Sequence, residues 1–150
     1  MSLKERLTED MKQAMKDKEA GKLRLSVIRM VRANIKNVEI DGKKELSEDE
    51  VLAIVAKEVK MRRDSIEEFT KGNRLDLVET LVLEIETLMN YLPEQLSEAE
   101  IRTLVEQTVS EVNAVSPKDM GKVMAVLSPK VKGRADGKVV NTIVREMLNQ

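Results

Sequence analysis

The sequence contains no cysteine and no histidine. Without cysteine the chain has no disulfides, no thiolate metal ligands and no thiol nucleophile. Without histidine it lacks the commonest general base and the commonest metal ligand. Aromatic residues are also scarce, with one Phe, one Tyr and no Trp. Acid–base chemistry would therefore fall to Asp, Glu, Lys or Tyr91, and we expect no catalytic residue, no metal site and no cofactor site.

Long apolar runs are missing as well. No run approaches membrane-spanning length, and the N-terminal residues MSLKERLTED lack the apolar core of a secretory signal. We therefore expect a cytoplasmic protein without a membrane partner. Charged residues make up 35% of the chain but nearly cancel, giving a net charge of −1. Any attraction to nucleic acid must then come from a local patch.

What the sequence does contain is a repeated helix pattern. Hydrophobic residues make up 41% of the chain, mainly Leu, Val, Ile and nine Met, spaced by threes and fours as in helices that pack on helices. Ser2, Ser47 and Ser97 each precede a Glu by three residues, the capping-box pattern that begins a helix. No stretch alternates apolar and polar residues for the length of a strand. The sequence predicts an all-α protein.

Pro93 divides the chain into two expected domains, residues 1–92 and residues 93–150. The first domain carries about four helices, most of them long, that should pack as a bundle. Polar or glycine-containing segments separate these helices, at Gly21, 41–44 and 72–73.

Three shorter helices are expected after Pro93, which match a small three-helix domain. They should span residues 98–113, 117–127 and 137–149. Ser116 and Pro117 are expected to start the second helix and Asp136 to cap the third. Gly121 would lie inside the second helix, where glycine costs about 1 kcal/mol relative to alanine. This cost favours close helix–helix packing at Gly121 over a ligand contact.

A first basic cluster lies on the third expected helix. It comprises Lys57, Lys60, Arg62 and Arg63, extended by Lys71 and Arg74. Acidic residues alternate with these cations at helical spacing, so salt bridges along the helix explain most of the cluster.

A second basic cluster lies between Ser116 and Lys138, where six cations face two carboxylates, a local charge of +4 against −5 for the rest of the chain. The cations are Lys118, Lys122, Lys130, Lys132, Arg134 and Lys138. We expect several of them to surround Gly133 in a turn, beside the positive dipole end of the last helix. Such a corner suits a phosphate backbone; the alternative is an ordinary solvated surface. With no aromatic residue nearby, phosphates rather than bases would be contacted.

Several motifs resemble the GatB/YqeY family. They are Tyr91-Leu92-Pro93-Glu94-Gln95-Leu96-Ser97, Asp119-Met120-Gly121-Lys122-Val123-Met124 and Lys132-Gly133-Arg134-Ala135-Asp136-Gly137. The opening residues 2–7 and the segment 62–77 are similar to free-standing YqeY-type members. The resemblance implies two helical subdomains, of which the second is like the tail domain of the B subunit of the tRNA-dependent amidotransferase. That tail helps hold tRNA, so the resemblance implies tRNA as a partner and places Lys122, Lys132 and Arg134 on the family motifs.

The same resemblance also implies a carbon–nitrogen ligase activity for the family, with glutamine as the amido-N-donor. The residues that perform this reaction in the amidotransferase, a Ser–Ser–Lys set and an ATP- and metal-binding cradle, have no counterpart in this sequence. We therefore expect a non-catalytic, tRNA-binding accessory module. A protein-interaction adaptor with a protein partner is the first alternative, and an amidotransferase-like ligase ranks last.

Overall fold

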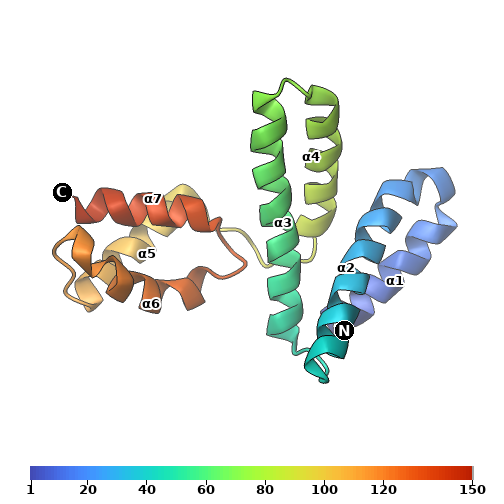
Figure 1. Cartoon of the computed structure of the whole chain (residues 1–150). Coiled ribbons are helices and arrows are strands. Elements are labelled where there is room, and N and C mark those ends of the chain that lie inside the picture. Colours follow the sequence, from blue (N-terminus) through green and yellow to red (C-terminus); the bar gives the residue numbers. More distant parts are fainter. Residues whose placement is uncertain (150) are drawn as a thin grey trace. The chain divides into compact units, whose positions relative to one another are not determined.

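The computed structural model describes residues 1–149, and all regular secondary structure within them is helical (Figure 1). The all-α fold class predicted from the sequence is confirmed. The chain forms two compact units, Met1–Leu92 and Pro93–Gln150. Each unit has its own apolar core, built from a separate set of buried side chains.

The first unit is built from four α-helices and one short 3-10 helix. They are α1 (Leu3–Lys16), η1 (Lys18–Gly21), α2 (Lys22–Gly42), α3 (Glu48–Lys71) and α4 (Leu75–Met89). Figure 1 shows two helical hairpins, α1 with α2 and α3 with α4, and α2 contacts both helices of the second hairpin. The largest side chains fully buried between them are Leu7, Ile28, Val31, Val51, Val55, Val59 and Leu88.

Serine caps begin three of the helices, as predicted. Ser2 forms a complete capping box, in which its hydroxyl accepts from the Glu5 backbone N–H at 3.1 Å and the Glu5 carboxylate accepts from the Ser2 N–H at 3.3 Å. Ser47 and Ser97 accept backbone N–H bonds in the same way, at 3.2 and 3.1 Å. These bonds satisfy N–H groups that would otherwise have no partner in the first turn of a helix.

The first helix ends earlier than predicted. α1 stops at Lys16, and the chain turns through η1 with Lys18 in the left-handed region, at a φ of 51°. Gly21 closes this turn and is buried against α1, where an added Cβ would lie 2.2 Å from the carbonyl oxygen of Ala14. The glycine therefore allows the backbone of α2 to begin directly against α1.

The second unit contains the three α-helices that the sequence predicted and one further 3-10 turn. They are α5 (Glu98–Glu111), η2 (Pro117–Asp119), α6 (Met120–Val131) and α7 (Gly137–Leu148). Each of the three α-helices contacts the other two. Their shared core is made of aliphatic side chains: Ile101, Val105, Val123, Leu127, Val131, Val140, Ile143, Val144 and Leu148.

The helix α6 is longer than predicted. We expected it to end at Leu127, but it continues through Pro129 to Val131. Proline removes one backbone hydrogen bond and disfavours a helical residue before it. The helix nevertheless continues, because Leu127 and Val131 both bury their side chains in the core of the second unit. As a result Lys130 lies on the last turn of α6 and not in the following loop.

Tyr91 connects the residues after α4 to α1. Its hydroxyl donates to the Asp10 carboxylate at 2.5 Å, and the Arg6 guanidinium lies over its ring, 5.1 Å from the centroid. Burial of the ring, followed by the hydrogen bond to Asp10, raises the pKa of Tyr91 well above its ordinary value. The phenol is therefore protonated in the folded protein under all ordinary conditions.

Because Tyr91 is the single tyrosine of the chain, the ultraviolet absorbance of tyrosinate reports this group alone. A raised pKa in the folded state means that Tyr91 stabilises the fold fully below the pKa of an unfolded tyrosine, about 10. This contribution is lost as the pH rises above that value, because the unfolded state releases its proton first. We expect tyrosinate to appear only together with the loss of helical circular dichroism. Tyrosinate forming near pH 10 in a fully helical protein would contradict the buried hydrogen bond.

Candidate nucleic-acid interface

The six cations of the second basic cluster are distributed over both ends of α6. Lys118 lies in η2 and Lys122 in the first turn of α6. The other four lie at the opposite end or just beyond it: Lys130, Lys132, Arg134 and Lys138. Since α6 has 12 residues, it is about 18 Å long, and Lys122 and Lys130 lie about 12 Å apart along its axis. The six cations therefore do not form the single corner expected from the sequence; they lie on η2, on α6, in the turn after α6 and on the first turn of α7.

All five lysines of this cluster are exposed, and we call the four on or next to α6, namely Lys118, Lys122, Lys130 and Lys132, the α6 surface. Among the described residues, no carboxylate lies within 4.0 Å of Lys118 or Lys132. Lys122 lies 4.0 Å from Asp119 and Lys130 lies 3.5 Å from Glu111. Such exposed pairs contribute little to stability, so all four ammonium groups are accessible to an incoming anion.

Asp119, the acid beside Lys122, is held by the backbone. Its carboxylate accepts from the N–H of Val115 at 2.9 Å and of Ser116 at 3.4 Å. The bond from Val115 is the main cause that lowers the pKa of Asp119. The side chain therefore stabilises the start of η2, and its oxygen lies 4.0 Å from the Lys122 ammonium.

Arg134 has a structural contact that the sequence did not indicate. Its Nε donates to the backbone oxygen of Glu94 at 3.3 Å, and its own backbone oxygen accepts from the Leu96 N–H at 2.8 Å. Beside it, Gln95 donates to the backbone oxygen of Gly133 at 2.8 Å, where Gly133 has a φ of 74° that favours glycine. The motif segments 91–97 and 132–137 are therefore joined to each other by hydrogen bonds.

Gly121 does not take part in close helix packing, and the prediction that it does is wrong. A Cβ added to Gly121 would meet no atom within 4 Å, and the residue is exposed in the first turn of α6. It lies between Lys118 and Lys122 in the sequence, on the same helix end.

Asp136 caps α7 as predicted, because its carboxylate accepts from the Lys138 backbone N–H at 2.9 Å. The cluster on α3 also has the salt bridges expected of it. Lys60 lies 3.5 Å from Asp64 and Lys71 lies 3.9 Å from Glu67. Lys60, Arg62 and Lys71 thus each have a carboxylate of the same helix within 4.0 Å.

The described residues 1–149 contain no group of three or more Asp and Glu side chains placed to hold a metal ion. No helix in this part of the chain has the length and apolar character needed to cross a membrane. Beside the C-terminal end of α6 lies a hollow of about 430 Å³, lined mostly by apolar residues such as Met124, Pro129 and Val140, with Lys132 among them.

A second basic surface was missed in the sequence. Residues 20–38 contain five cations and no acidic residue, namely Lys22, Arg24, Arg29, Arg32 and Lys36. A count of charge in a sliding window would have found this segment, which is more strongly basic than residues 116–138. The structure places it on α2, where Arg24 pairs with Asp17 and three of the others line a groove beside α1.

The sequence matches the family model described as Yqey-like protein over residues 4–148. The chain belongs to this family. The resemblance drawn from the motifs is thereby confirmed, and the match extends over both units.

Similar proteins occur in fungi. A protein of Lachancea thermotolerans named "Altered inheritance of mitochondria protein 41, mitochondrial" is 42% identical over 114 residues, covering 74% of this chain and 60% of that protein. A protein of the same name from Pyrenophora tritici-repentis is 31% identical over 146 residues, covering 95% of this chain and 79% of that protein. An uncharacterized protein of Schizosaccharomyces pombe is 30% identical over 95 residues, covering 63% of this chain and 72% of that protein. The chain spans 60% of the length of the Lachancea relative.

The cytoplasmic location expected from the N-terminal sequence is wrong, because the Lachancea and Pyrenophora relatives, like others of the same name, are named as mitochondrial proteins. The expectation relied on the absence of an apolar signal segment. Such a segment marks secretion, whereas mitochondrial targeting segments are amphipathic and rich in arginine. The absence of an apolar signal segment therefore has no bearing on a mitochondrial location.

Proposed function

We propose that this protein is a non-catalytic accessory module that binds tRNA through the α6 surface. The observation that carries the proposal is that Lys118 and Lys132 are exposed at opposite ends of α6 with no carboxylate within 4.0 Å among the described residues. Lys122 and Lys130 add two cations with only long or exposed acidic contacts. Arg134 lies in the turn between α6 and α7, and Lys138 lies in the first turn of α7.

A polyanion fits this surface better than a single phosphate. The cations extend over about 18 Å along α6, whereas a nucleic-acid strand carries a phosphate every few ångströms and contacts several cations in succession. Residues 116–138 include no Phe, Tyr or Trp, so bases have no ring to stack on. Contacts to phosphates and to the shape of a folded RNA are then the main source of affinity. The similarity of the second unit to the amidotransferase tail favours tRNA among RNAs.

The test is a filter-binding titration of the full chain with bulk tRNA at two salt concentrations. If four phosphates are contacted, log affinity falls against log salt with a slope of about −0.9 per phosphate on duplex RNA. The double variant Lys118→Glu/Lys132→Glu is expected to bind on the order of tenfold more weakly at low salt, with a slope smaller by about two phosphate contacts.

The matched control is Lys16→Glu/Lys57→Glu, which makes the same change in net charge at exposed lysines of α1 and α3. It is expected to bind tRNA like the parent chain. The proposal fails if bulk tRNA does not bind at low salt, or if both double variants weaken binding equally. A protein partner recovered without nucleic acid would favour the adaptor alternative instead.

A further inference from the structure

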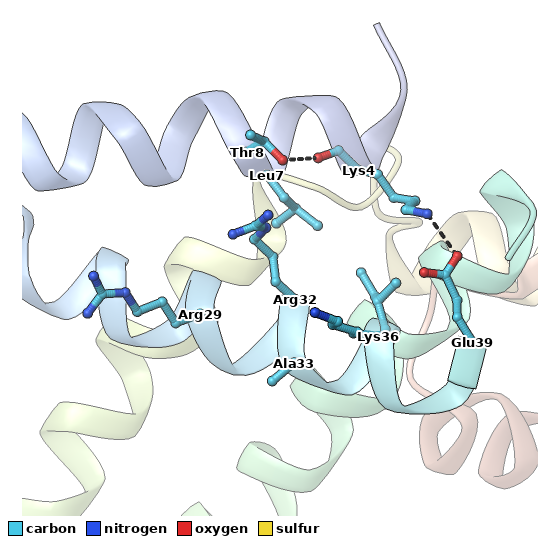
Figure 2. A pocket seen from close by; sticks show the side chains of 9 residues that line it. Lys4, Leu7, Thr8, Arg29, Arg32, Ala33, Lys36 and Glu39 are labelled. Carbon is cyan, nitrogen blue, oxygen red and sulfur yellow. Dashed lines mark hydrogen bonds and ion pairs between the residues drawn. The ribbon is translucent and has the colours of Figure 1, made fainter. Parts of the chain in front are cut away.

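A groove of about 420 Å³ runs between α1 and α2 in the first unit (Figure 2). This volume lies within the range of small-molecule binding sites. Leu7 and Ile35 contribute apolar side chains to it, and both are buried. Four cations and one carboxylate line the same groove, which leaves a net charge of +3 beside an aliphatic surface.

The single carboxylate of the groove does not neutralise these cations. Glu39 accepts from the Lys4 ammonium at 2.8 Å, the contact that Figure 2 marks, and from the Leu46 backbone N–H at 2.8 Å. The Lys4 hydrogen bond is the first cause that lowers the pKa of Glu39. Lys4 and Glu39 therefore cancel each other, and the remaining charge belongs to the cations on α2.

Arg32 is the central cation of the groove. Figure 2 shows its side chain rising from α2 toward Leu7 of α1. It is half-buried, and the partner of its Nη1 is the neutral sulfur of Met11, at 2.8 Å. A cation that is partly removed from water and lacks an anion is unfavourable, and no carboxylate among the described residues lies within ion-pair distance of Arg32. An anion that enters the groove would remove this penalty.

Arg29 and Lys36 extend the positive charge on both sides of Arg32. Residues three and four apart on a helix lie on the same face, so the three side chains follow one stripe of α2. Arg29 and Lys36 are exposed, and among residues 1–149 neither has an acidic partner within 4.0 Å. Two guanidinium groups and one ammonium group next to each other match the several oxygens of a phosphoryl group, which arginine binds in a bidentate manner.

We infer that this groove binds the phosphoryl group of a nucleotide-sized phosphate ester, with Arg29, Arg32 and Lys36 on the phosphoryl oxygens and the aliphatic floor against the rest of the ligand. The ligand is either a free nucleotide or one nucleotide of an RNA strand, since both present the same chemistry. The inference does not rest on the tRNA proposal, because it concerns different residues in the other unit.

The test compares the full chain with the double variant Arg29→Ser/Lys36→Ser, which changes two exposed side chains. Calorimetric titrations use inorganic pyrophosphate, ATP and a short single-stranded RNA as separate probes. Lys16→Ser/Lys57→Ser is the control with the same change in net charge. We expect the groove variant to bind at least one probe on the order of tenfold more weakly, while the control binds like the parent.

Loss of pyrophosphate and ATP binding would identify a free phosphorylated ligand, and loss of RNA binding alone would identify an RNA strand as the source of the phosphate. A third variant, Arg32→Met, is expected to lose binding while its melting temperature stays equal or rises, because a cation without an anion has been removed. If no probe distinguishes the groove variant from the control, the inference is overturned. The variant Lys118→Glu/Lys132→Glu should bind these probes like the parent chain. A failure of the tRNA proposal and a failure of the groove inference would therefore give different results.

Discussion

Replacing Arg62 with methionine is expected to lower the free energy of unfolding by about 3–5 kcal/mol. Arg62 and Glu58 lie one turn apart on α3 with only 6% and 5% of their surfaces exposed. The guanidinium donates to the Glu58 carboxylate at 2.6 Å and to the Glu58 backbone oxygen at 3.1 Å. Methionine preserves most of the volume but leaves the Glu58 charge buried without a cation.

The ion pair also connects three helices, α2, α3 and α4. Asn34 of α2 donates to Glu58 at 2.5 Å, and Glu84 of α4 lies 3.4 Å from Arg62 Nε. This last contact is an ion pair without a hydrogen bond, since Arg62 Nε has no hydrogen-bond partner. Loss of the arginine thus affects contacts to α2 and α4 as well as within α3.

Urea denaturation of three variants would measure this effect. The single variant Arg62→Met should be strongly destabilised, whereas Arg62→Met/Glu58→Met should recover most of the loss, because the buried Glu58 carboxylate is removed together with its cation. Lys60→Met removes one partner of the exposed pair with Asp64 and should change stability by less than about 1 kcal/mol. A single Arg62 variant as stable as the Lys60 variant would show that the buried pair has no structural role.

Gly21→Ala should be the most disruptive small substitution in the first unit. Its Cβ would lie 2.2 Å from the Ala14 carbonyl oxygen and 2.9 Å from two further backbone atoms of Ala14. Backbone atoms cannot rotate away as a flexible side chain can, so α1 and α2 must separate at this end. We expect a loss of about 3 kcal/mol or more, at the upper end of overpacking effects, measured as a lower midpoint of urea denaturation.

Gly121→Ala is the matched control, since the same methyl group at Gly121 meets nothing within 4 Å. There alanine should stabilise α6 by up to about 1 kcal/mol, because glycine is a poorer helix former. Equal effects of the two substitutions would rule out the close approach of α2 to Ala14. A Gly121→Ala chain that is more stable but binds tRNA more weakly would also indicate that RNA approaches the backbone at this position.

Helix starts were well predicted because they depend on residues close in sequence. Ser2, Ser47, Ser97 and Asp136 all accept the backbone bonds expected of helix caps. Helix ends were less well predicted, since they depend on packing. The continuation of α6 past Pro129 is decided by burial of Val131 in the core, which a local pattern does not reveal.

The candidate interfaces also combine features that local sequence reveals with features that only packing decides. The sequence located the six cations of residues 116–138, but their separation along α6 followed from the true end of that helix. The groove beside α2 was missed although its cations lie in a segment without acids. Charge along a sequence does not show whether cations are paired, and only the packing of α1 against α2 brings Met11 rather than a carboxylate to Arg32.

The sequence by itself determined that this protein is helical, where α1, α3, α5 and α7 begin, and to which family it is related, because these properties depend on spacing, capping residues and short motifs. The tertiary structure alone decided which charges are neutralised: Arg62 is buried with Glu58, while Lys118, Lys132 and Arg29 have no acidic partner within 4.0 Å among the described residues. The physical reason is that the interaction energy of a charge depends on its distance from other charges and on its exposure to water. Both are set by residues far apart in the chain.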